Sequence, residues 1–354
     1  MYCKHCSYDL RSIANQCPEC GAPFEPSNPD TFLKMRPNRF YWRLRNTMVA
    51  VLACMGVPCF VLTWLWYGWH EESEALQTMR GSPRFVVVAE DQFPIIHRLL
   101  PKQFKYITER AVLVRVNSPK GADFRLIAGL RKLRTLVTIY AEICDDDLRC
   151  LQGLQNLQEL YLTKASITNG ALKHIAPLVK LRTLDLINTN IDGADLSEIS
   201  NLSEMRNLNL YGTRIQGEAM ASLAKMRNLT SLNLSGTMVT DKGLESISHF
   251  SQLTSLSLED TVIGDEGILT ISKLVKIQEL FLSRTRVTAA GVRCLAAMPN
   301  LHSLELQQTA INDDSVNDLC QLRGLQVLNV RFTQMSGRGV TNLKKELPNA
   351  LIIE

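Results

Sequence analysis

Apolar residues recur with a period of 24 residues through most of the chain. Counted from each repeat start, the apolar columns are positions 1, 4, 6, 11, 16, 19 and 22. The starts follow one another without insertion or deletion at Leu133, Leu157, Leu181, Met205, Leu229, Leu253, Ile277, Leu301 and Leu325. A fixed period of this length predicts a single array of stacked structural units.

Each repeat contains two kinds of local pattern. In the repeat that starts at Leu229, Leu232 and Leu234 alternate with polar residues, which predicts a strand with one face inward. Positions 16, 19 and 22 are three residues apart, which predicts a helical segment or a 3₁₀ turn. Because one strand and one short helix cannot bury a core alone, neighbouring units must stack. We expect an α/β solenoid with a parallel sheet on the concave face and helices on the convex face.

Polar residues also fall into columns. We expect the hydroxyl at position 9 to bond backbone groups where the chain leaves the sheet, although a functional threonine ladder is the alternative. This column holds Thr189, Thr213, Thr237, Thr261, Thr285, Thr309 and Thr333. Position 12 offers helix N-caps, namely Thr168, Asp192, Thr240, Thr288, Asn312 and Ser336. Glycine recurs at position 15, where we expect tight packing, in Gly243, Gly267, Gly291 and Gly339.

The combined pattern, L-x-x-L-x-L-x-x-T-x-V/I-T-D-x-G-L, resembles the cysteine-containing class of leucine-rich repeats and bacterial 24-residue variants of it. Threonine replaces the usual Asn or Cys at position 9. The resemblance implies a leucine-rich-repeat solenoid of about ten coils over residues 109–354. Some members of that class are subunits of ubiquitin ligases, but no F-box segment is present here, so this role is not carried over.

The two ends of the array need units that cover its core. We expect residues 70–108 to form a stalk and an N-terminal cap, with a polar stalk at 70–83, a strand at 84–89 and a helix at 94–106. A degenerate first coil follows at Glu109, with Val112 and Val114 in the strand positions. Residues 350–353 are expected to form the last edge strand.

Residues 47–69 contain no charged side chain and are long enough to cross a bilayer as a helix of roughly 34 Å. Basic residues precede this segment, at Lys34, Arg36, Arg39, Arg43 and Arg45, and Glu71, Glu72 and Glu74 follow it. This asymmetry predicts a single-pass membrane protein with a cytoplasmic N-terminus and extracytoplasmic repeats. The alternatives are a cleaved signal peptide, for which the polar leader is too long, and a buried core helix.

Two C-x-x-C pairs near the start, Cys3/Cys6 and Cys17/Cys20, predict one structural Zn²⁺ held by four thiolates. A redox dithiol is the alternative, but no βαβ pattern follows it. Residues 2–24 resemble the minimal zinc ribbons found at the start of bacterial membrane proteins. We therefore divide the N-terminal region into a zinc ribbon at 1–24 and a linker with a basic juxtamembrane segment at 25–46. Four further cysteines show no paired spacing: Cys144, Cys150, Cys294 and Cys320.

Charge and motifs argue against two other classes of function. The net charge is +4, and no basic tract with interleaved aromatic residues occurs, so nucleic acid is not expected as a partner. Six histidines are scattered, and no nucleotide-binding or hydrolase signature is present. The acidic run Asp145–Asp147 is interpreted as a solvated helix start. We therefore do not expect an enzyme.

Any binding specificity must come from positions 3, 5, 7 and 8, which point out of the concave sheet or lie at its edge. Exposed aromatic and arginine side chains are enriched at interaction hot spots. The main candidates for contacting a partner are Phe281, Arg284, Glu305, Arg331 and Phe332, and a second group is Tyr161, Asp185 and Tyr211. We expect a membrane-anchored module that binds a protein or peptide. The alternatives are ordinary solvated residues on this face and a structural or adhesion scaffold of the cell envelope.

Overall fold

The computed structural model describes residues 2–3, 32–33, 75–76, 78–79, 85–91, 109–116, 124–139 and 142–354. The chain divides into two compact units, Met1–Trp69 and His70–Glu354. In the first unit, β1 (Tyr2–Cys3) pairs antiparallel with β2 (Phe32–Leu33). The strand β2 lies in the stretch 25–46 that the sequence pattern assigns to a linker.

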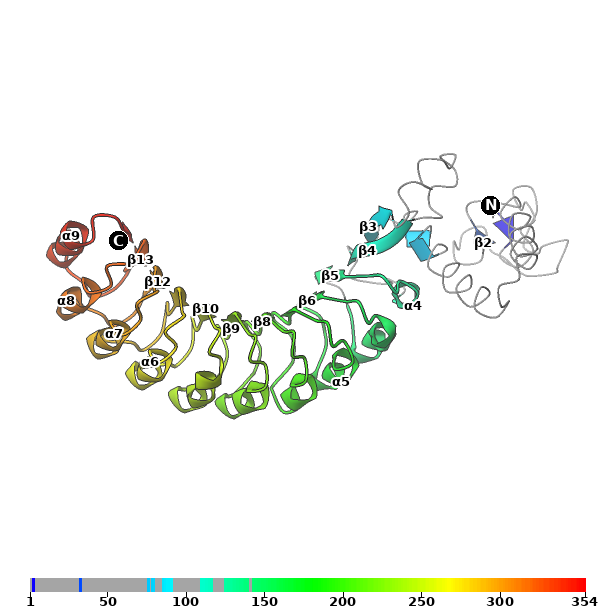
Figure 1. Ribbon diagram of the computed structural model, residues 1–354, viewed down its shortest axis with the longest axis horizontal. Coiled ribbons are helices and arrows are strands. Elements are labelled where there is room, and N and C mark those ends of the chain that lie inside the picture. The colour runs from blue at the N-terminus through cyan, green and yellow to red at the C-terminus, as the bar shows by residue number, and fades with distance from the viewer. Residues whose placement is uncertain are drawn as a thin grey trace, which may run out of the picture. The chain divides into compact units, whose positions relative to one another are not determined.

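The second unit contains one sheet of twelve strands, ordered along the chain from β3 to β14 (Figure 1). The strand β3 is antiparallel to β4, and every later neighbour pairs in parallel. The strands are β3 (Phe85–Asp91), β4 (Glu109–Val116), β5 (Thr135–Ile139), β6 (Glu159–Thr163), β7 (Thr183–Asp185), β8 (Asn207–Asn209), β9 (Ser231–Asn233), β10 (Ser255–Ser257), β11 (Glu279–Phe281), β12 (Ser303–Glu305), β13 (Val327–Asn329) and β14 (Leu351–Ile353). The strands expected at 84–89 and 350–353 are confirmed by β3 and β14.

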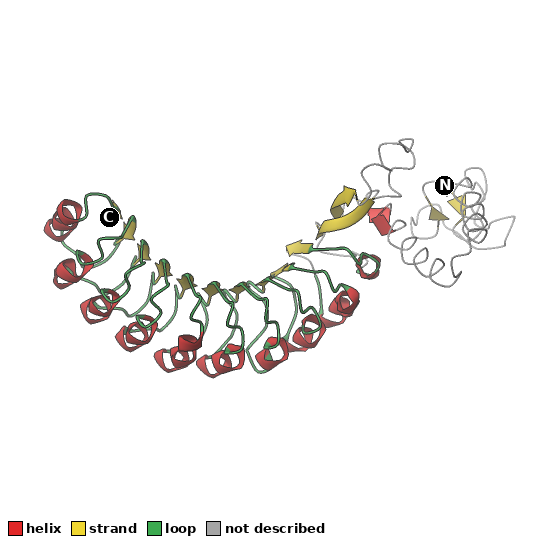
Figure 2. Cartoon of the chain, viewed as in Figure 1, coloured by secondary structure: helices red, strands yellow, loops and turns green. Residues whose placement is uncertain are grey.

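The helical segments form the outer row of the solenoid, and the strands form its concave inner row (Figure 2). Most of them are one or two turns long, and several are 3₁₀ rather than α. The α-helices are α4 (Arg125–Ala128), α5 (Leu172–Ile175), α6 (Asp265–Ile271), α7 (Ala289–Leu295), α8 (Val316–Leu319) and α9 (Gly337–Glu346). The 3₁₀ segments are η3 (Asp145–Gly153), η4 (Asn169–Ala171), η5 (Leu196–Ile199), η6 (Gly217–Leu223), η7 (Asp241–His249) and η8 (Asp313–Ser315).

The 24-residue register is confirmed from β5 to β14, where each strand residue faces the residue 24 positions later, as in Leu232 with Leu256. The first coil differs. Val114 faces Leu136, so this coil is two residues shorter than the others. The buried strand positions are therefore held by Val114 and Val116, and the assignment to Val112 and Val114 is wrong. A slip of two residues keeps the same side chains inward, so alternation alone does not reveal it.

One continuous hydrophobic cluster runs through the described part of the second unit. It is built from the predicted apolar columns and reaches Ile352 in β14. At its beginning it also includes Ala75, Leu76 and Met79. The segment 70–83 is therefore not only a polar stalk, because its apolar residues pack into the core. The helix expected at 94–106 lies outside the described residues.

The threonine column does what the sequence predicts. In the seven repeats that carry it, the position 9 hydroxyl donates to the carbonyl of position 6 at 2.6–2.8 Å. In several of these repeats the amide of the same threonine donates to that carbonyl too, as Thr213 does to Leu210. The two bonds close the turn at which the chain leaves the sheet. The column is structural.

A second ladder joins the convex loops. Asp265, at position 13 of its repeat, accepts hydrogen bonds from the amide and the hydroxyl of Thr288, at position 12 of the next repeat, at 2.8 and 2.7 Å. Asp145 does the same for Thr168, and Asp313 for Ser336. A side chain on three of the position 15 glycines would meet the aspartate of the preceding repeat: Asp241 for Gly267, Asp265 for Gly291 and Asp313 for Gly339. The fourth, Gly243, instead lies against the backbone of Gly217, so the aspartate column explains three of the four glycines.

Candidate functional site

Position 8 adopts the same unusual backbone conformation in eight consecutive repeats. Its φ angle lies between 52° and 65°, in the left-handed region. We call these the rim residues: Lys164, Asn188, Gly212, Gly236, Asp260, Arg284, Gln308 and Phe332. The amide of each of the first seven donates to the position 7 carbonyl of the next repeat, as Arg284 does to Gln307 at 2.8 Å. The rim is therefore a rigid, hydrogen-bonded edge of the sheet.

Position 5 is less available for binding than the sequence suggests. Asn209, Asn233 and Asn329 each accept a hydrogen bond from the amide two residues later, at 2.9–3.1 Å. Asp185 does the same with Ile187. The position 6 carbonyl is occupied by the position 9 threonine. The position 5 side chains therefore accept hydrogen bonds from the position 7 amides, at the point where the strand ends and the turn begins.

Asp185 is consequently not an open contact residue. Only 8% of it is exposed, and its carboxylate also accepts from Thr163 at 3.1 Å and from Asn209 at 3.3 Å. Burial raises the pKa of this carboxyl above its ordinary value, against the lowering effect of the three donors. Its neighbour across the sheet is Tyr161, whose pKa is raised by burial and by Glu159 and Asp185. Asp185 contributes to the sheet rather than to a surface.

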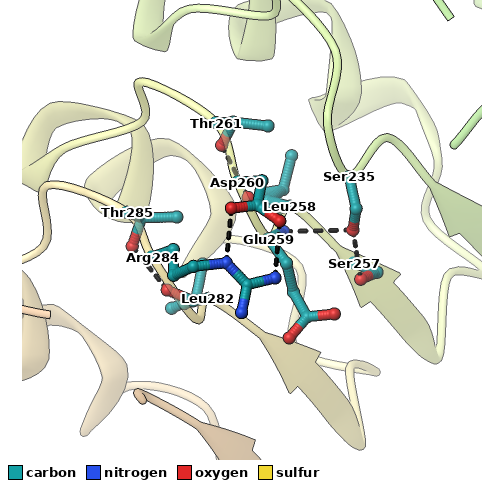
Figure 3. A network of polar contacts seen from close by, with 9 residues as sticks. All are labelled: Ser235, Ser257, Leu258, Glu259, Asp260, Thr261, Leu282, Arg284 and Thr285. Atoms are coloured by element: carbon teal, nitrogen blue, oxygen red, sulfur yellow. Dashed lines mark hydrogen bonds and ion pairs between the residues drawn. The ribbon is translucent and has the colours of Figure 1, made fainter. Parts of the chain in front are cut away.

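Arg284 binds within the chain (Figure 3). Its guanidinium donates to both carboxylate oxygens of Asp260, the rim residue one repeat earlier. These bonds hold the pKa of Asp260 below its usual value and raise that of Arg284, with further contributions to Arg284 from Glu259 and Tyr211. Arg284 is thus directed toward Asp260, one repeat nearer the N-terminus, and away from the C-terminal candidates.

The remaining C-terminal candidates lie together. Phe281 and Glu305 face each other in adjacent strands, and both are half-buried. Two strands later, Arg331 places its guanidinium 5.7 Å from the ring centroid of Phe332, a cation–π distance. The rim residue Phe332 is 71% exposed, more than any other large hydrophobic residue in the described part of the chain. We call Phe281, Glu305, Arg331 and Phe332 the C-terminal concave cluster.

Leu351 was not among the predicted contact residues. It is exposed in the last strand, β14, beside Val327 of β13. The same holds for Val86 and Val88, which are exposed on β3. Both cases follow from alternation: residues between the buried positions of an edge strand face outward. We assigned β3 and β14 only as caps, so their outward-facing residues were not among the predicted contact residues.

Charged residues are divided between the two edges of the parallel sheet. The last five residues of each repeat and the first two of the next lie where strands begin. Between residues 128 and 326 these loops contain one acid, Glu204, and eleven bases, all exposed: Arg131, Lys132, Arg134, Lys180, Arg182, Arg206, Lys225, Arg227, Lys273, Lys276 and Arg323. We call this edge the basic flank. The opposite edge, which begins at the rim, carries both signs.

The predicted zinc ligands are mostly outside the described residues. Cys3 ends β1, while Cys6, Cys17 and Cys20 have no described position. The described part of the chain contains no group of three or more residues suited to hold a metal ion. Cys144, Cys294 and Cys320 are free thiols. The four-cysteine zinc site remains a prediction from spacing.

The predicted membrane span at 47–69 also lies outside the described residues. Among the residues that are described, no helix is both long and apolar enough to cross a bilayer.

The repeats, their parallel sheet and the convex helices together have the architecture of a leucine-rich-repeat solenoid. Residues 225–248 and 251–272 match the family model described as Leucine Rich repeat. No curated protein matches the sequence.

Several solved structures are similar in fold. An internalin (InlF) from Listeria monocytogenes str. 4b F2365 is 22% identical over 66% of this chain and 77% of its own, with a TM-score of 0.46. Internalin C2 (InlC2) of the same strain is 20% identical over 75% of this chain and 92% of its own, with a TM-score of 0.47. A TDR receptor is 18% identical over 68% of this chain and 41% of its own, with a TM-score of 0.49.

Proposed function

We propose that this protein is a binding module whose concave face recognises a protein or peptide through the C-terminal concave cluster. The observation that carries the proposal is the exposure of Phe332 at the last rim position, with Arg331 against its ring. Covering a phenylalanine side chain gains about 1.5–3 kcal/mol. Aromatic and arginine side chains held in a fixed geometry lose little entropy when a partner binds.

The neighbouring groups fit the same role. Glu305 offers a carboxylate beside Phe281, so the cluster presents an anion, a cation and two aromatic rings over three adjacent strands. The partner that matches this set is a peptide segment with an apolar side chain between charged ones. Arg284, which is occupied by Asp260, supports the rim and is not assigned to the contact surface. The proposed role is binding rather than catalysis.

Alanine at Phe281, Arg331 and Phe332 together is expected to weaken capture of the partner at least about a hundredfold, because hot-spot residues cost about 2 kcal/mol or more each. A photo-crosslinking residue at position 332 first identifies the partner in cells, and its affinity for the triple variant is then measured. The matched control is alanine at Ile187 and Asn188, which occupy positions 7 and 8 six repeats earlier. Unchanged capture by the triple variant contradicts the proposal. Broad, salt-sensitive crosslinks without one stoichiometric partner indicate an envelope scaffold instead.

We also propose that residues 47–69 anchor the chain in a bilayer, with a zinc ribbon at 1–24 in the cytoplasm and the repeats outside. The uncharged segment, its basic N-terminal side and its acidic C-terminal side support this arrangement. Protease added to intact cells is expected to digest the repeats and spare the ribbon, with lysed cells as the control. Protection of the repeats together with loss of the ribbon would reverse the topology.

A further inference from the structure

The basic flank is a built surface and not a set of scattered charges. Its loops stack through hydrogen bonds between repeats: the side-chain amide of Asn228 donates to the Ser203 carbonyl, and that of Asn300 to the Val275 carbonyl, both at 2.8 Å. Backbone amides add a second ladder, as Arg206 donates to the Arg182 carbonyl at 2.8 Å. Because the strands from β4 to β14 are parallel, every one of these loops lies on the same edge of the sheet.

The charge in the loops of this flank is mostly of one sign, because they hold eleven bases and the single acid Glu204. Arg182 pairs with Glu204 at 3.1 Å. Lys180 and Lys276 donate to the neutral side chains of Asn156 and Gln252, at 2.9 and 2.7 Å, which orient the ammonium groups without cancelling their charge. The opposite edge differs, because it mixes acids with bases. The chain is therefore electrostatically asymmetric although its net charge is only +4.

The size of the flank favours an extended anionic surface over a small anion. Nine successive loops at about 4.8 Å per strand span roughly 40 Å, several times the Debye length of about 8 Å at physiological salt. A small anion meets two or three of these charges at most. A surface that carries many anions meets all of them at once.

Exposed aliphatic side chains decide which anionic surface fits. Val179 and Val275, at position 23 of their repeats, are 52% and 53% exposed and stand beside Lys180 and Lys276. Aliphatic side chains among bases are typical of surfaces that settle into a lipid headgroup region. Single-stranded nucleic acids are instead bound by exposed aromatic rings, and Phe250, the one Phe, Tyr or Trp residue in these loops, is fully buried.

We propose that the basic flank lies against an anionic lipid bilayer, with Val179 and Val275 entering the headgroup layer. The inference uses residues 128–326 alone and holds with or without an anchor at 47–69. It orients the solenoid edge-on to the membrane, so that the concave face stays open to a partner from the side.

Lysine reactivity tests this orientation in the full chain. The chain is mixed with vesicles of phosphatidylcholine alone, or of phosphatidylcholine and phosphatidylglycerol in equal parts, and treated with a water-soluble amine-acylating reagent. Peptide mass spectrometry then gives the labelling rate of each lysine. On the anionic vesicles, labelling of Lys180, Lys273 and Lys276 is expected to slow several-fold. Labelling of Lys164 and Lys242, on the opposite edge, serves as the internal control and stays unchanged.

A charge-removal variant provides the second measurement. Glutamine at Lys225, Arg227, Lys273 and Lys276 is expected to reduce the difference in partitioning between anionic and neutral vesicles by about fivefold per base. The matched control places glutamine at Lys164, Lys242, Arg286 and Arg338.

Two labelling results overturn the proposal: equal labelling of the flank lysines on both kinds of vesicle, or equal slowing of lysines on both edges of the sheet. Slowing caused by DNA at the same salt, and not by anionic vesicles, overturns it in favour of a nucleic-acid surface.

Discussion

Replacing Phe250 by alanine is expected to lower the free energy of unfolding by about 3–5 kcal/mol. Phe250 is among the largest fully buried side chains, and it ends the 3₁₀ segment η7 near the middle of the array. The other repeats place leucine or methionine at this position, except the last, which has Glu346. Truncation to alanine leaves a cavity that the stacked neighbours on both sides cannot fill. Because each coil contacts only its neighbours, a defect here also weakens the coupling between the two halves.

The measurement is urea unfolding of the full chain, followed by circular dichroism. Phe250→Leu is the matched control, since leucine suits the same position in other coils, and its cost is expected to be about 1 kcal/mol. A lower slope of unfolding free energy against urea in the alanine variant would indicate that the two halves separate. Equal midpoints for alanine and leucine would contradict a cavity at this site.

The fold could be predicted from the sequence because the 24-residue period repeats one packing problem many times. A leucine at position 4 or 6 must face inward in every coil, and a single ambiguous residue such as Met205 is decided by its neighbours. The role of the threonine column also followed from position alone, since the chain must turn at position 9 and a hydroxyl there meets a carbonyl. The first coil lacked this support, and its register was assigned two residues away.

The candidate site was harder to predict, since it depends on conformations that residue types do not reveal. The rim turn imposes a positive φ on Lys164, Arg284 and Phe332 as well as on glycines. Glycine at positions 212 and 236 was the available sequence signal. The pairing of Arg284 with Asp260 links residues 24 positions apart and requires the rim geometry to be known. The structural use of Asp185 became visible only with its three donors in place.

The surface of the solenoid consists of parts with different roles. Position 5 asparagines and the buried Asp185 maintain the sheet, so much of the concave floor is fixed by the fold. In the proposed function, specificity is concentrated where this structural pattern is absent, at Phe281, Glu305 and the rim around Phe332. The basic flank is a separate surface on the edge where strands begin. If both proposals hold, a partner on the concave face and a bilayer at the flank are bound through separate surfaces.

Replacing Gly291 by alanine is expected to destabilise the solenoid by about 2–4 kcal/mol, through steric overlap and the loss of hydrogen bonds. A Cβ atom at Gly291, in the helix α7, would stand too close to the Asp265 carboxylate of the preceding repeat. That carboxylate accepts from the amide and the hydroxyl of Thr288. To make room, Asp265 must move and give up one or both bonds. The expected loss is measured as a lower midpoint in urea unfolding.

A double-mutant cycle shows whether Asp265 is the cause. Asp265→Ala alone is expected to cost about 1–2 kcal/mol, as for the loss of a helix cap. In that background the obstacle is gone, and Gly291→Ala should then cost less than about 1 kcal/mol, because alanine also favours the helix. The control is Gly337→Ala in α9, where nothing lies near the added atom and stability should stay level or rise slightly. Additive costs for the two substitutions would show that the glycine column is set by something other than the aspartate ladder.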